Sequence, residues 1–184
     1  VIHPEDIRYH LEKALYMAAT GRPGPVWLDL PLDVQGAIIE TESLRAYDPA
    51  ENPEQRPQEI LQETIEKILD KIEESHRPVL SPGNGVRLAG AIEEFHELVD
   101  VLGVPVVTGM SSVDALESDH PYFVGRSGGT GTRPGNFALQ NSDVLLSIGN
   151  RQGFAQTGFQ YQDWARESYT ILNDIDENEL KKPN

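Results

Sequence analysis

From residue 58 onward, short apolar runs alternate with longer stretches whose apolar residues recur every three or four positions. The apolar runs lie at residues 78–81, 104–108, 144–148 and 169–173, and helical patterns cover residues 61–72, 88–102 and 136–141. This alternation is typical of βαβ units, which form a parallel sheet with helices on both faces. We therefore expect an α/β fold with a doubly wound, Rossmann-like parallel sheet flanked by helices.

The first 57 residues have a different pattern. A helix is predicted from Pro4 to Gly21, followed by a short strand at residues 26–30 that has no partner strand nearby. Residues 36–57 contain several prolines and carboxylates without periodicity, which favours an interdomain linker over a long loop within one domain. The chain opens with Val1 and ends just after a strand, so we expect a piece of a longer polypeptide.

Composition excludes several classes of function. Lys and Arg number 15 against 30 Asp and Glu, giving a net charge of −15. Such a surface repels phosphate backbones and anionic lipids, so we expect neither nucleic-acid nor membrane binding. The absence of cysteine excludes disulfides, thiolate-bound metals and thiol catalysis. No apolar run approaches the roughly 18 residues of a membrane span, and no signal peptide is visible.

Candidate binding residues follow the predicted strands, because ligands of open parallel sheets bind at the carboxyl ends of the strands. Glycines there let the backbone approach a phosphate, an arginine can grip a diphosphate with two hydrogen bonds, and an aspartate can accept from a ribose hydroxyl. The candidates are Gly83, Asn84, Gly85, Thr108, Gly109, Met110, Gly125, Gly131, Gly149, Arg151, Asp174 and Asp176. Arg151 is the sharpest candidate for contact with a diphosphate.

Each candidate also has a structural interpretation, and the residues alone leave both open. Gly83–Gly85 fits a tight turn, since the spacing to Gly90 is too long for a dinucleotide fingerprint. The glycine- and arginine-rich stretch 125–133 fits a solvated loop, and Asp174 and Asp176 fit the start of a helix. The five histidines are scattered, and no motif indicates a metal site or a catalytic nucleophile.

Two segments closely resemble thiamine-diphosphate enzymes of the acetolactate synthase type. Residues 18–35, which contain PGPVWLDLPLDVQ, resemble the end of the pyrimidine-binding domain. Residues 77–182 resemble the central domain, with GNG at 83–85, GVPVVT at 103–108, DHP at 119–121, NSDVLLSIGNR at 141–151 and DIDENEL at 174–180. On this resemblance, residues 1–35 are the tail of the pyrimidine-binding domain, 36–57 a linker, and 58–184 a central nucleotide-binding-like domain.

The resemblance implies the central region of a thiamine-diphosphate-dependent 2-oxo acid decarboxylase and carboligase, most like the acetolactate synthase large subunit. It implies about six parallel strands in this domain, and a cytoplasmic homo-oligomer when the protein is complete. Thiamine diphosphate and Mg²⁺ would bind outside this chain, since the activating glutamate would lie upstream and the Gly-Asp-Gly motif downstream. The chain alone would therefore be non-catalytic.

The occupant of the central domain is left open among FAD, an ADP-type nucleotide and nothing. Acetolactate synthases carry Met-His-Gly where this chain has residues 128–131, and Arg-Phe-Asp-Asp-Arg where only Arg151 matches. We therefore expect FAD to bind weakly or not at all. The alternatives are a related decarboxylase with an empty central pocket and a stand-alone nucleotide-binding module. An NAD-dependent dehydrogenase is disfavoured because the G-x-G-x-x-G motif is missing.

Overall fold

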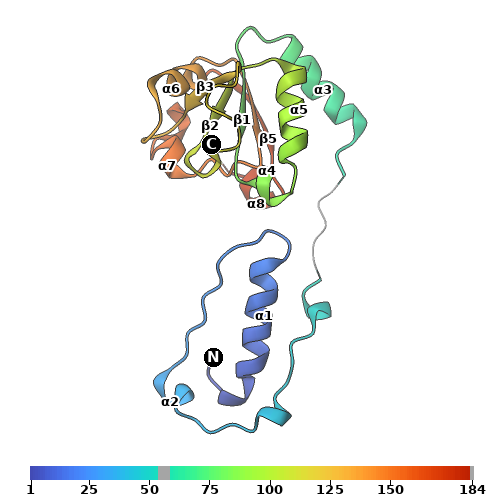
Figure 1. The fold of residues 1–184 in the computed structure, drawn as a ribbon, viewed down its shortest axis with the longest axis vertical. Coiled ribbons are helices and arrows are strands. Elements are labelled where there is room, and N and C mark those ends of the chain that lie inside the picture. Colours follow the sequence, from blue (N-terminus) through green and yellow to red (C-terminus); the bar gives the residue numbers. More distant parts are fainter. Residues whose placement is uncertain (54–58, 183–184) are drawn as a thin grey trace. The chain divides into compact units, whose positions relative to one another are not determined.

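The structure is a computed structural model that describes residues 1–53 and 59–182. The chain divides into two compact units, Val1–Gln58 and Glu59–Asn184, which are described separately (Figure 1). Within the described residues, no helix is long and apolar enough to cross a membrane. All twelve candidate binding residues lie in the second unit.

The second unit contains a sheet of five parallel strands, close to the number expected, in the order β3-β2-β1-β4-β5. The strands are β1 (Pro78–Pro82), β2 (Val106–Thr108), β3 (Phe123–Arg126), β4 (Val144–Ile148) and β5 (Tyr169–Asn173). The chain proceeds outward from β1 to β3 and then crosses back to β4, on the other side of β1. This reversal confirms the doubly wound α/β fold.

Helices cover both faces of this sheet, with α3 and α5 on one side and α6 and α7 on the other (Figure 1). The longer helices are α3 (Gln62–Glu73), α5 (Ile92–Leu102) and α6 (Arg133–Gln140). The shorter ones are α4 (Gly85–Leu88), α7 (Phe154–Thr157) and α8 (Glu177–Leu180), with 3₁₀ turns η4 (Met110–Ser112) and η5 (Tyr161–Asp163). Because successive side chains of a strand point to opposite faces, each strand contributes to two cores.

The two cores are built from neighbouring positions of the same strands. Leu80 of β1 and Leu146 of β4 pack in one core with Phe95 and Val99 of α5. The other core contains Val79, Val107 and Leu145 together with Leu139 of α6, with Trp164 packed against it. Strands buried on both faces explain why the sequence shows continuous apolar runs at these positions.

The turn before β1 is fixed by a carboxylate from the segment before β4. The carboxylate of Asp143 accepts hydrogen bonds from the Ser75 hydroxyl and from the backbone amides of His76 and Arg77, the last two at 2.9 Å. Burial alone would raise the pKa of Asp143, but these hydrogen bonds outweigh it and hold the pKa well below its ordinary value. The neighbouring strands β1 and β4 are thereby tied together at their amino ends.

Two helix boundaries and one strand differ from what the sequence indicated. The helix expected over residues 88–102 is two helices, α4 and α5, because Gly90 adopts a φ of +71° between them. The helix α6 begins at Arg133 instead of residue 136, since Thr132 caps it and accepts a hydrogen bond from the Gly135 amide. The strand β3 lies within residues 109–135, a glycine-rich stretch in which the sequence analysis identified no strand.

The first unit is built on α1 (Ile7–Ala19), which is preceded by the 3₁₀ turn η1 (Pro4–Asp6). It also contains α2 (Leu32–Gln35) and two 3₁₀ turns, η2 (Thr41–Ser43) and η3 (Pro49–Glu51). Tyr47 is buried and packs its ring against Tyr9 and Tyr16 of α1, so part of the expected linker contacts this helix. Residues 54–57 of the expected linker lie outside the described residues.

The strand expected at residues 26–30 does not form, and this prediction is corrected. A strand needs a hydrogen-bonded neighbour, and the described part of the first unit pairs no other strand with this segment. Trp27 is 90% exposed, and Leu32 and Ile38 are also largely exposed. Among the described residues of this unit, only Val34 and Tyr47 are buried hydrophobic side chains. The unit therefore has a small core of its own.

Candidate functional site

The candidate residues lie at or just after the carboxyl ends of the five parallel strands. The order reverses between β1 and β4, which lie next to each other with Pro82 opposite Ile148. A crevice at such a reversal is the usual binding place in open α/β sheets. The geometry of the loops after β1 and β4 therefore decides what this edge can bind.

The loops after β1 and β4 are in direct contact. The Gly83 amide donates to the carbonyl of Ile148 at 2.8 Å, and the Gly85 amide donates to the carbonyl of Gly149 at 2.9 Å. A Cβ atom on Gly83 would lie 2.2 Å from the Gly149 oxygen and 2.3 Å from the Cα of Asn150. The structure thus brings the predicted residues Gly83, Gly85 and Gly149 together, and glycine is needed because the two backbones touch.

The loop after β2 is tied to the end of β1. Ser112 of η4 receives a hydrogen bond from the Gly109 amide at 3.0 Å, and its hydroxyl donates to the Pro82 carbonyl at 2.7 Å. Thr108 is fully buried, whereas Met110 is 66% exposed. Thr108 and Gly109 therefore lie within a hydrogen-bonded turn, and Met110 projects from it.

The glycine-rich loop after β3 folds back on α6. The side chain of Asn136 accepts from the Gly128 amide at 2.9 Å and donates to the Gly128 carbonyl at 3.2 Å. The Gly131 amide donates to the same carbonyl at 2.9 Å, and Gly125, with φ at +146°, faces the Thr132 hydroxyl. The loop is compact, which differs from the solvated loop that the sequence left open.

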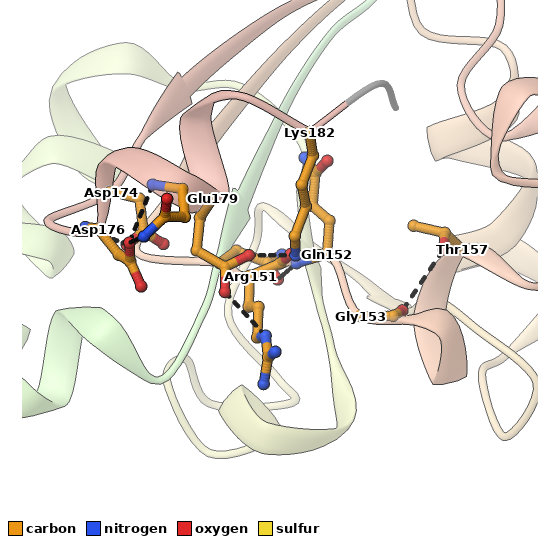
Figure 2. Close-up of polar contacts among 10 residues, drawn as sticks. Arg151, Gln152, Gly153, Thr157, Asp174, Asp176, Glu179 and Lys182 are labelled. Atoms are coloured by element: carbon orange, nitrogen blue, oxygen red, sulfur yellow. Dashed lines mark hydrogen bonds and ion pairs between the residues drawn. The ribbon is translucent and has the colours of Figure 1, made fainter. Parts of the chain in front are cut away.

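Arg151 directly follows the β4 loop, and its guanidinium contacts a carboxylate. Its Nε atom lies 2.9 Å from Oε1 of Glu179, a side chain of α8 that is only 8% exposed. Lys182 contacts the other oxygen of Glu179 and donates to the Arg151 carbonyl at 2.9 Å. Figure 2 shows Arg151 and Lys182 converging on Glu179. The sequence reasoning missed Glu179, because a partner 28 positions downstream gives no local signal.

Asp174 and Asp176 shape the turn between β5 and α8. The Asp174 carboxylate accepts from the Asp176 amide at 3.0 Å, and the Asp176 carboxylate accepts from the Asn178 amide at 2.9 Å. Asp176 is therefore the N-cap of α8 (Figure 2), one of the two roles that the sequence allowed.

Buried and half-buried amide side chains close the rest of this edge, and the sequence reasoning did not single them out. Asn150 donates to the Ser81 hydroxyl at 3.1 Å and accepts from the Gln152 amide at 3.1 Å. Gln152 is 5% exposed and has a φ of +51°, which is uncommon outside glycine. Gln156 of α7 donates to the Ser127 hydroxyl at 2.9 Å and so joins the β3 and β4 loops.

Two pockets lie away from these residues. One, of about 580 Å³, is lined by Gln140, Thr157, Gly158, Phe159, Gln160, Asp163 and Trp164. The other, of about 160 Å³, lies in the first unit and is lined by Pro4, Ile7, Leu30, Val34, Gln35, Ala37 and Ile39. None of the predicted binding residues lines either pocket. Within residues 1–53 and 59–182, no cluster of three metal-ligating side chains is present.

Comparison with known proteins identifies the family. The model of the family described as "Thiamine pyrophosphate enzyme, central domain" matches residues 65–184. A probable acetolactate synthase large subunit of Methanocaldococcus jannaschii is 37% identical over 97% of this chain and 30% of its own length. The acetolactate synthase large subunit of Corynebacterium glutamicum is 36% identical over 99% of this chain and 29% of its own length.

A third relative, the acetolactate synthase isozyme 2 large subunit of Escherichia coli, is 30% identical over 97% of this chain and 31% of its own length. The chain thus spans about 30% of the length of the curated relatives that it matches. The parallel sheet, the match to the family model and these relatives agree with the resemblance found in the sequence. The chain therefore belongs to the thiamine pyrophosphate enzyme family, of which it contains the central domain.

Proposed function

We propose that this chain is the central region of a thiamine-diphosphate-dependent 2-oxo acid decarboxylase and carboligase, most like the acetolactate synthase large subunit. The observation that supports this most is similarity to such subunits over 97–99% of the chain. The complete protein would decarboxylate a 2-oxo acid and transfer the resulting carbanion to an acceptor. Thiamine diphosphate and Mg²⁺ would supply that chemistry from sites outside the 184 residues.

The role that we propose for the chain itself is structural. The polar groups at the carboxyl edge act within the chain: Asp176 caps α8, Asn136 holds the β3 loop, and Glu179 binds Arg151. None of these contacts sets up a general base or an activated nucleophile. We therefore propose that the region is non-catalytic.

The organisation of the complete protein is also a proposal. Residues 1–35 would end the pyrimidine-binding domain, 36–57 would be a linker, and 58–184 the central domain. The exposed Trp27 and Leu32 fit a segment that other parts of a larger domain would cover. We further propose a cytoplasmic homo-oligomer. Any nucleotide of the central domain would lie along the edge formed by the twelve candidate residues, from Gly83 to Asp176.

A second candidate is a related decarboxylase with an empty central pocket. The contact between the Gly83 and Gly149 loops favours it, because this contact occupies the crevice where the family could hold a nucleotide. A stand-alone nucleotide-binding module is the remaining alternative. A reading frame without a Gly-Asp-Gly segment downstream of residue 184 would identify such a module.

The test is an assay of the complete gene product with a panel of 2-oxo acids. We expect release of CO₂ from pyruvate or a close analogue only when thiamine diphosphate and Mg²⁺ are both present. Acetolactate or a homologue as the product would support the carboligase, whereas an aldehyde alone would support the decarboxylase. No cofactor-dependent turnover of any 2-oxo acid would refute the proposed function.

A further inference from the structure

A nucleotide diphosphate bound at the edge of a parallel sheet needs backbone amides that point at it. At this edge the amides of seven glycines already donate within the chain. The acceptors for Gly83, Gly85 and Gly149 are the carbonyls of Ile148, Gly149 and Asn173. Four further glycine amides also have acceptors: Gly109 donates to the Ser112 hydroxyl and Gly128 to the Asn136 side chain. Gly129 donates to the Ala155 carbonyl and Gly131 to the Gly128 carbonyl.

The space between the β1 and β4 loops, where the strand order reverses, is also filled. A Cβ atom on Gly85 would lie 2.7 Å from the Cα and from the carbonyl oxygen of Gly149, and one on Gly149 would lie 2.8 Å from the Cα of Gly85. A diphosphate is much larger than a methyl group, so it cannot enter between these loops without separating them. Separation would break the hydrogen bonds at 2.8 Å and 2.9 Å that join the loops.

Three of the positive side chains near this edge are already engaged. The guanidinium of Arg151 and the ammonium of Lys182 both contact the buried carboxylate of Glu179. Arg133, one of the two arginines in the stretch 125–133, lies over the Phe137 ring at 5.4 Å. An incoming phosphate would have to compete with Glu179 for Arg151, next to the carboxylates of Asp174 and Asp176.

We infer that the carboxyl edge of this central domain does not hold a dinucleotide or an ADP-type nucleotide, although its sheet has the topology of nucleotide-binding domains. The loops donate hydrogen bonds to one another instead, and Arg151 and Lys182 bind Glu179. The inference rests on the proposed function and deepens it: the thiamine chemistry of the complete protein would proceed without a nucleotide in this domain. It concerns binding and not turnover.

The experiment follows the glycine amides of the ¹⁵N-labelled chain by NMR during titration with ADP and with FAD. At about 1 mM ligand, which is enough to detect millimolar affinity, we expect no saturable shift at Gly83, Gly85, Gly128 or Gly149. Saturable shifts at these amides, weakened by Arg151→Ala, would overturn the inference. Shifts confined to other residues would support it, because the nucleotide would then lie elsewhere.

Two variants of α8 test the role of the carboxylate. Glu179→Gln releases Arg151, whereas Glu177→Gln, on the same helix, removes only the exposed pair with Lys181. We expect neither variant to reach micromolar affinity for ADP, since the amides stay engaged. Tight binding gained by Glu177→Gln would contradict the reasoning. Micromolar binding gained only by Glu179→Gln would also contradict it, because the engaged glycine amides and the contact between the loops should exclude the nucleotide even without the carboxylate.

A second readout does not depend on the isolated chain. The complete protein, purified with FAD present, should release no stoichiometric flavin on denaturation. Stoichiometric flavin that is lost in Arg151→Ala would overturn the inference, even if the protein turned over 2-oxo acids. Absence of turnover would overturn only the proposed function, so the two failures are distinguishable.

Discussion

Replacing Gly83 by alanine tests the contact between the β1 and β4 loops. The added methyl would meet backbone atoms of Gly149 and Asn150 at 2.2 Å and 2.3 Å, so a loop must move by about 1 Å or more. Overpacking in a rigid place costs about 1–3 kcal/mol. The movement also weakens the hydrogen bonds from Gly83 and Gly85, each worth about 0.5–1.5 kcal/mol. We expect the free energy of unfolding to fall by about 3 kcal/mol.

The assay is urea unfolding of the second unit, followed by the fluorescence of Trp164, which packs against its core. The chain has two tryptophans, and the other, Trp27, is 90% exposed and can be replaced by phenylalanine in the parent and in every variant. Gly129→Ala is the matched control, because its Cβ would meet no atom within 4 Å. A loss for Gly83→Ala within about 0.5 kcal/mol of the control would refute the reasoning.

Three further predictions concern other parts of the chain. Asp143 has a lowered pKa, so its stabilising effect is complete above about pH 4 and is lost below. In Asp143→Asn the free energy of unfolding by urea should therefore fall less steeply as the pH is lowered below about 4. An unchanged pH dependence would contradict this. Glu179→Gln should speed hydrogen exchange in α8 about fivefold relative to Glu177→Gln; equal rates would argue against the ion pair. Amides of residues 26–30 should exchange far faster than those of β4, and equal protection in a monomer would count against an unpaired segment.

Much of the sheet was predictable, because its inner strands β1, β2 and β4 are buried on both faces and every strand but β3 has an apolar run. The apolar runs at 144–148 and 169–173 coincide with β4 and β5. β3 was missed because Gly125 interrupts its short apolar pattern, and only pairing with β2 makes it a strand. The segment 26–30 shows the reverse case, since its residues favour a strand but no described neighbour in its unit pairs with it.

The candidate edge was predictable as a place but not as a set of contacts. Strand ends follow from the topology, and Gly83, Gly85 and Gly149 do come together. Which amides remain available depends on loops that are distant in sequence, such as Gly128 with Asn136 and Gly129 with Ala155. The pairing of Arg151 with Glu179 likewise follows from the position of α8 beside the β4 loop, which no local pattern indicates.

The most direct test of the central claim is thiamine-diphosphate-dependent consumption of pyruvate by the purified 184-residue chain, measured beside the complete gene product. The account predicts turnover by the complete protein and none by the chain, with thiamine diphosphate and Mg²⁺ present in both assays. Pyruvate consumption by the pure chain would show that catalytic groups lie within these residues, and it would contradict the account.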